Sequence, residues 1–179
     1  MRFLRQLFRL WLNSLRSRSK RAGNEYPERS EKSTPEVLAP NEQISRFLYS
    51  KSTFSLSNKR VKPGAFSPPP DLSLSAVHST GVQELNIWSI GRRTLGTQPG
   101  RNTIYGRADL PVESLIAQKL QAIRDDNPFE RHTSVVGWPQ DPDKERQKED
   151  IKAICLEISL DPKVRLVAAD PPVRIDAIR

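Results

Sequence analysis

The segment from His132 to Ala168 constrains the fold most, because it reads as a strand, a helix and a strand in direct succession. Its first part carries Val135 and Val136, followed by Trp138, and this β-branched and aromatic bulk is typical of a short buried strand. Pro139 cannot donate to a sheet ladder, so the strand is expected to stop there. We therefore expect this segment to form a βαβ-like scaffold on which the rest of the domain packs.

The middle of that segment predicts a charged helix. Asp141 can cap it, and Pro142 suits the first helical position, where its missing N–H costs nothing. Asp161-Pro162 should end the helix, and residues 164–168 then read as an apolar strand. The apolar face of the helix recurs at spacings of three and four and comprises Ile151, Ile154, Cys155 and Ile158. The position of Cys155 on this face predicts a small buried hydrophobe rather than a nucleophile.

The positive charge of the chain is concentrated at its start. The net charge is +8, from 29 lysines and arginines against 21 acidic residues. Seven of these cations precede the first acid, Glu25, which leaves 22 cations against 21 acids afterwards. The high isoelectric point is therefore no evidence that the folded domain binds nucleic acid.

Residues 2–15 form an amphipathic pattern with leucine and aromatic residues on one side and arginines on the other. Four roles fit this basic arm: attachment to an anionic membrane surface, docking on an unknown protein partner, contact with nucleic acid, or a cleaved transit peptide. We expect a cytoplasmic protein, held peripherally at the inner face of the membrane in the first case. The residues expected to contact a surface or partner are Arg2, Arg5, Leu7, Phe8, Arg9, Trp11, Leu15, Arg16, Arg18, Lys20 and Arg21.

The sequence predicts an arm at 1–21, a Pro- and Ser-rich linker at 22–41, a single domain at 42–170 and a tail at 171–179. The domain should be α+β or a small mixed α/β fold, with three helices and four to five short strands, both parallel and antiparallel. Its expected core consists of Leu74, Leu85, Trp88, Ile104, Leu115, Val135, Trp138, Ile151, Ile154 and Ile158.

Local signals predict the remaining elements of the domain. They are a short helix from Asn41 to Leu48, a strand over 72–78, a helix from Gly81 to Gly91 opened by a Thr80/Gln83 capping box, a strand over 102–107, and a helical turn opened by Asp109 and Pro111. Residues 118–126 fit a helix or a strand, and the run Asp-Asp-Asn-Pro at 125–128 is turn chemistry in both cases.

Two tripeptides, His78-Ser-Thr80 and His132-Thr-Ser134, each follow the pattern His-x-Thr/Ser beside a predicted strand. In this they resemble the two-histidine phosphoesterases, although Ser79 and Thr133 stand where that family has an apolar residue. The resemblance implies that the histidines act as acid and base at a phosphodiester and that the hydroxyls hold the phosphate. The alternative is that both histidines are surface or capping residues at strand ends.

A second resemblance concerns the segments Arg-Val-Lys-Pro-x-Ala-Phe-x-Pro from residue 60 and His-x-x-Val-Val-Gly-Trp-Pro from residue 132. Both are similar to segments of small bacterial proteins that are known only as uncharacterised. The similarity covers roughly residues 42–168, and it implies a self-contained domain and a prokaryotic source but no activity.

Motifs for other chemistries are missing from the sequence. One cysteine and two histidines lack the spacing of a zinc site, and there is no phosphate-binding glycine loop and no Gly-x-Ser-x-Gly. We therefore expect no metal, no cofactor and no small-molecule ligand. The sequence favours a non-catalytic accessory or interaction module tethered by its basic arm, with a nucleic-acid-associated protein and a phosphoesterase-like enzyme as alternatives.

Overall fold

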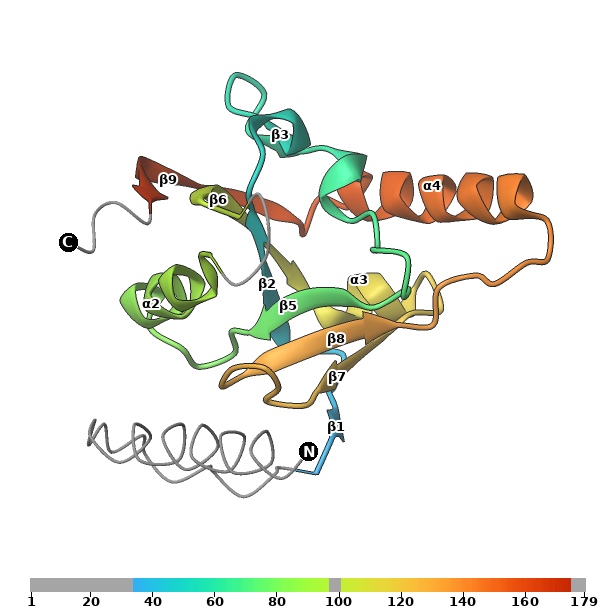
Figure 1. The fold of residues 1–179 in the computed structure, drawn as a ribbon, viewed down its shortest axis with the longest axis horizontal. Coiled ribbons are helices and arrows are strands. Elements are labelled where there is room, and N and C mark those ends of the chain that lie inside the picture. Colours follow the sequence, from blue (N-terminus) through green and yellow to red (C-terminus); the bar gives the residue numbers. More distant parts are fainter. Residues whose placement is uncertain (1–33, 97–100, 175–179) are drawn as a thin grey trace, which may run out of the picture. The chain divides into compact units, whose positions relative to one another are not determined.

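The computed structural model describes residues 34–96 and 101–174 of the chain, which belong to one compact unit (Figure 1). The predicted arm at 1–21 and most of the predicted linker lie outside the described residues. The described part is an α+β domain with three α-helices, as the sequence predicts. The helices are α2 (Glu84–Thr94), α3 (Val112–Ile116) and α4 (Lys144–Leu160), and there are two short 3-10 turns, η2 (Lys51–Thr53) and η3 (Pro63–Ala65).

The sheet has seven strands in the order β1-β7-β8-β5-β2-β6-β9, and all its pairs are antiparallel. The prediction of four to five strands in a mixed sheet was therefore wrong. The strands are β1 (Glu36–Val37), β2 (Gln43–Leu48), β5 (Leu74–His78), β6 (Thr103–Pro111), β7 (Gln121–Arg124), β8 (His132–Val136) and β9 (Arg165–Arg174), while β3 (Phe54–Ser55) and β4 (Arg60–Val61) form a separate hairpin. Strand β7 settles the open assignment of residues 118–126.

Each face of the sheet carries its own apolar cluster. On one face, Phe47 and Val77 pack with Ile87 and Ile90 of α2. On the other face, residues of β2, β5 and β8 pack with Leu115 of α3 and with the buried side of α4. Since strand side chains alternate between the two faces, this arrangement decides which residues of β5 and β8 can meet.

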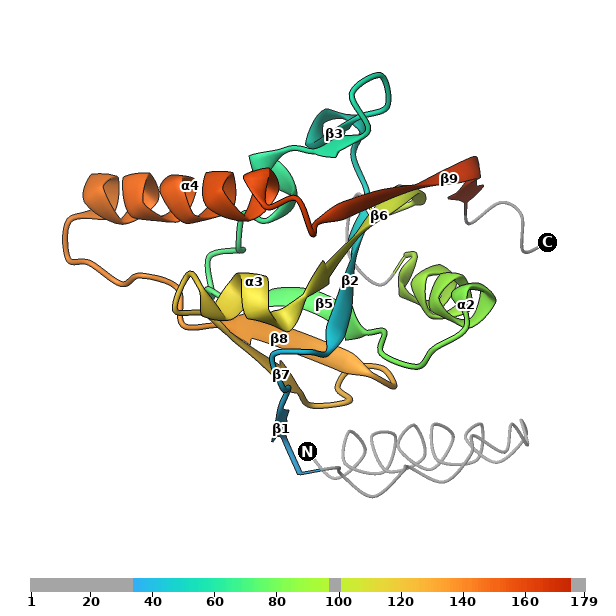
Figure 2. The same ribbon diagram turned by 180° about the vertical axis from the view of Figure 1, so that it is seen from behind.

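Residues 43–48 form strand β2, not the predicted helix from Asn41. This strand lies in the sheet between β5 and β6 (Figure 2). Both of its faces are covered, so Ile44, Phe47 and Leu48 are all buried and the alternation of a half-exposed strand is lost. A spacing of three and four residues therefore arises here without a helix.

The strand–helix–strand prediction for 132–168 is confirmed in its elements and corrected in its details. Helix α4 is capped by Asp143, whose side chain accepts from the N–H groups of Glu145 and Arg146, rather than by Asp141. Strands β8 and β9 are not neighbours, because β5, β2 and β6 lie between them. The connection through α4 therefore spans three intervening strands.

The domain extends beyond its predicted limits at both ends. Strand β1 pairs with β7 and the next residue, Leu38, is buried, so residues 36–41 belong to the domain rather than to the linker. At the other end β9 continues to Arg174, which brings residues 171–174 of the predicted tail into the sheet. Strand β1 has only two residues, which is too few to give a pattern, and the two prolines at 171–172 conceal the second half of β9.

Most of the predicted core is confirmed, but Leu85 is 75% exposed and was wrongly assigned. The buried side of α2 is made by Ile87, Ile90 and Gly91, and Leu85 lies away from it. Gly91 does not end the helix, which continues to Thr94; it lies within the last turns of α2, where the helix backbone packs against Phe47. Six predicted residues are buried, namely Leu74, Ile104, Leu115, Val135, Trp138 and Ile158, while Trp88, Ile151 and Ile154 are partly buried.

The start of α2 also differs from the prediction. Its N-cap is Gln83, which makes no side-chain capping bond, so the expected capping box is not formed. Thr80 instead uses its hydroxyl oxygen to accept the backbone N–H of Gln43 at 2.7 Å.

None of the helices in 34–96 and 101–174 has both the length and the apolar character needed to cross a bilayer.

Candidate functional site

The two histidines singled out by the sequence lie on neighbouring strands but point to opposite faces of the sheet. In the register of β5 and β8, Val77 stands directly opposite His132, so these two side chains share a face. His78 follows Val77 in the same strand and therefore points the other way. The geometry expected from the phosphoesterase resemblance, with both imidazoles facing one cleft, is not formed.

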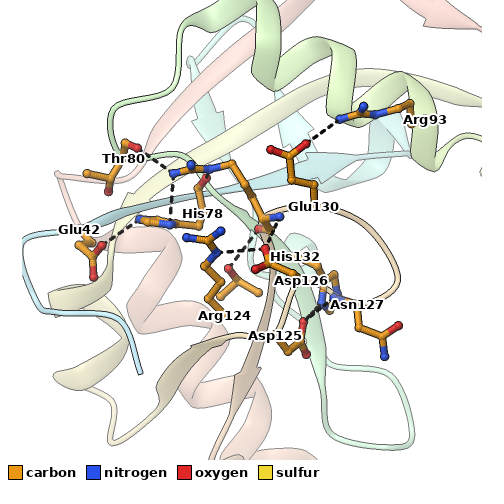
Figure 3. A network of polar contacts seen from close by, with 12 residues as sticks. Glu42, His78, Thr80, Arg93, Arg124, Asp125, Asp126, Asn127, Glu130 and His132 are labelled. Carbon is orange, nitrogen blue, oxygen red and sulfur yellow. Dashed lines mark hydrogen bonds and ion pairs between the residues drawn. The ribbon is translucent and has the colours of Figure 1, made fainter. Parts of the chain in front are cut away.

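His78 is buried and held by charged neighbours. Its Nε2 lies 2.9 Å from a carboxylate oxygen of Glu42, and its Nδ1 lies 3.3 Å from a guanidinium nitrogen of Arg131 (Figure 3). Burial is the main cause that lowers the pKa of His78, and the nearby Arg131 lowers it further against the opposing effect of Glu42. A buried neutral imidazole between these side chains serves to hold this end of β5 in place.

His132 forms a relay with two residues that the sequence did not single out. Its Nδ1 lies 2.5 Å from Oδ1 of Asp125 (Figure 3), and its Nε2 lies 2.9 Å from Oγ of Ser75. Because the carboxylate can only accept, Nδ1 of the neutral ring carries the proton, and Nε2 is left to accept from the Ser75 hydroxyl. This is the order of contacts by which a serine–histidine–aspartate triad activates its serine.

The sheet register positions the serine against the histidine. Ser75 stands opposite Ser134 in the β5–β8 ladder, two residues along from the Val77–His132 pair, so Ser75 and His132 are diagonal neighbours on one face. The Phe129 ring and the imidazole form a T-shaped pair, with their planes at 89° and their centroids 4.9 Å apart. The register and this aromatic contact together fix the imidazole plane.

The carboxylate of Asp125 is fixed from several sides. Asp125 directly follows β7, and its backbone N–H donates to the carbonyl of His132. Its Oδ2 accepts from the hydroxyl of Ser134 at 3.0 Å, and its Oδ1 also accepts from the N–H of Asn127 at 3.2 Å. Ser134, a predicted site residue, therefore orients the aspartate and does not face the reacting end of His132, while Thr80 lies on the side of His78.

The relay opens into a cavity of about 400 Å³. A volume of this size suits a small organic ligand. Ser75 and His132 contribute to its lining, together with Phe47, Phe129, residues 67–69 and two arginines. The serine hydroxyl can therefore meet a small molecule, which a hydroxyl sealed within the core could not.

The cavity forms where strands β2 and β5 part. Their ladder is limited to two opposed pairs, Ile44–His78 and Ser45–Val77. Beyond these pairs Arg46 fills the gap, with one nitrogen donating to the carbonyl of Ser75 at 2.7 Å and another to that of Ala65 at 3.4 Å. The guanidinium therefore replaces ladder bonds next to the serine, and the side chains around it line the cavity.

Other nucleophiles and metals have less support in the described part of the chain. Burial raises the pKa of the Cys155 thiol to about 11, which leaves almost no thiolate at neutral pH. Within residues 34–96 and 101–174, no three histidine, cysteine or acidic side chains are grouped so as to hold a metal ion.

Comparison of the chain with protein-family models, curated proteins and solved structures gives no match.

Proposed function

We propose that this domain is a serine hydrolase that cleaves a small ester or amide through Ser75. The observation that carries the proposal is the unbroken contact from Asp125 through His132 to Ser75 at the wall of an open cavity. A triad is identified by geometry and roles, not by sequence motif or fold, so the missing Gly-x-Ser-x-Gly does not argue against it.

The chemistry follows from the protonation states of the relay. Oγ of Ser75 attacks the acyl carbon while its proton moves to Nε2 of His132, and Asp125 stabilises the resulting imidazolium. The imidazolium then gives the same proton to the leaving group, so that an acyl-serine remains. Water attacks this ester by the reverse route, with His132 taking the water proton and returning it to Ser75.

The experiment is to treat the full-length protein with a fluorophosphonate probe and to follow p-nitrophenyl ester hydrolysis. We expect Ser75→Ala to abolish labelling and His132→Gln or Asp125→Asn to slow it by about 10³- to 10⁴-fold, as in triads of known enzymes. Ser73→Ala is the matched control, because Ser73 lines the same cavity and lies two residues from Ser75 in sequence.

Each variant needs a thermal unfolding curve, because loss of a core contact would also lower reactivity. A folded Ser75→Ala protein that hydrolyses the ester as fast as wild type would refute the proposal. Ser73→Ala should label at the wild-type rate. Equal loss in the two serine variants would point to a general disturbance of the cavity and would count against a specific role for Ser75.

A separate proposal concerns the basic arm, and it rests on the seven cations and the apolar face within residues 1–21. We propose that this arm holds the domain to an anionic membrane surface. Trp11→Glu, on the predicted apolar side, should reduce co-sedimentation with anionic vesicles, and Asn13→Glu is a control with the same charge change on the basic side. Equal binding by wild type and Trp11→Glu would exclude membrane attachment through this face and favour a protein or nucleic-acid partner.

A further inference from the structure

Two arginines line the cavity next to Ser75 and have no carboxylate partner among the described residues. Arg46 and Arg101 both contribute to the wall, and across 34–96 and 101–174 no acidic side chain lies within ion-pair distance of either. The other charged group on the wall is the exposed Asp71, one oxygen of which accepts the N–H of Ser73. Cations therefore outnumber anions around the cavity.

The two guanidinium groups are fixed in place by uncharged contacts. Arg46 donates to the carbonyls of Ser75 and Ala65, which use only some of its five N–H groups. Arg101 lies over the ring of Tyr49, 4.8 Å from its centroid. Burial and the nearby Arg101 lower the pKa of Arg46 to about 10, so Arg46 is still cationic at neutral pH. A guanidinium held only by carbonyls and an aromatic face keeps donors for an anion.

We propose that the cavity binds an ester or amide that also carries a carboxylate, with Arg46 and Arg101 holding the carboxylate while the acyl carbon lies at Ser75. The acyl half of this inference rests on the proposed hydrolase function, whereas the anion site does not. A planar carboxylate matches the fork of a guanidinium, and contacts with both arginines would orient the acyl group.

Binding is measured first on Ser75→Ala, which cannot turn the ligand over. Monomethyl succinate should bind more tightly than the neutral dimethyl succinate, and Arg101→Ala in the same background should weaken its binding about 10- to 100-fold. Lys51→Ala is the matched control, because Lys51 also lies over a tyrosine ring, that of Tyr105, but does not line this cavity.

Turnover is then compared in the wild type for two p-nitrophenyl esters, the anionic hemisuccinate and the neutral butyrate. We expect kcat/KM for the hemisuccinate to be higher than for the butyrate, and Arg101→Ala to lower the ratio of the two values towards one. Because Arg46 also bridges β5 to η3, its variants can unfold the domain, so Arg101 carries the test.

The outcomes separate the two proposals. Binding of monomethyl succinate that depends on Arg101, without hydrolysis of either p-nitrophenyl ester, would support the anion site and refute the hydrolase. Hydrolysis through Ser75 with no preference for the anionic ester would support the hydrolase and overturn the anion site. Binding of monomethyl succinate that is equally strong in Arg101→Ala and in Lys51→Ala would also overturn the anion site.

Discussion

Replacement of Gly91 by alanine tests the packing of α2 on the sheet. A Cβ atom at this position would lie 2.6 Å from two ring atoms of Phe47 and 3.1 Å from Cδ1 of Ile104. The methyl group of Ile104 can move by rotation, but the Phe47 ring is buried on the same face as the cavity and lines it. The variant therefore forces either the ring or the helix to shift.

The two opposing energies decide the sign of the effect. Alanine gains about 1 kcal/mol over glycine inside a helix, whereas insertion of a methyl group into a packed core costs about 1–3 kcal/mol. Because the clash is with a buried ring, we take the upper half of that range, and Gly91→Ala should lose about 1–2 kcal/mol of unfolding free energy. For a chain of this size this corresponds to a Tm lower by about 2–8 °C.

The assay is chemical denaturation and thermal unfolding, with Gly64→Ala as the control. Gly64 lies in a short helical turn, and a Cβ atom added there would have no neighbour within 4 Å, so its replacement should be neutral or slightly stabilising. A Gly91→Ala protein that is more stable than wild type would show the gain in helix propensity alone. That result would refute the contact between α2 and Phe47.

Two further predictions concern buried titratable groups. Burial and Arg131 hold the pKa of His78 below its ordinary value of 6.5, so the unfolded chain binds more protons than the folded chain just below that pH. The unfolding free energy should therefore fall as the pH drops from 7 towards 5. His78→Gln should flatten this slope, and an unchanged slope would count against the buried neutral imidazole. The buried Cys155, with a thiol pKa of about 11, should react with iodoacetamide at pH 8 only after denaturation, and rapid alkylation of the native protein would contradict its placement.

The elements that the sequence predicts correctly are those specified by local chemistry. Helix α4 follows from its cap region and from Cys155 and Ile158 on one face, and β8 follows from its β-branched residues. Strand β2 could not be recognised, because its burial on both faces removes the two-residue period. The strand order is equally inaccessible, since it depends on pairings between segments far apart in the chain.

The candidate site shows the same limit. His132 and Ser134 stand out as a tripeptide, but their partners are set by the register of β5 against β8, which no local pattern encodes. Ser75 is one of two serines in the strand predicted over 72–78, and it lies 57 residues from the histidine that it contacts. Asp125 begins the run Asp-Asp-Asn-Pro, and because aspartate is common in turns, an aspartate there gives no sign of a further role. A serine and an aspartate next to a histidine can be recognised only once the sheet is assembled.

The most direct test of the account is to map the fluorophosphonate adduct on the native full-length protein by peptide mass spectrometry. We predict one adduct, on Ser75, that disappears in His132→Gln. An adduct on Ser73 or Ser134, or no adduct on a protein shown to be folded, would contradict the claim that Asp125, His132 and Ser75 form a working triad.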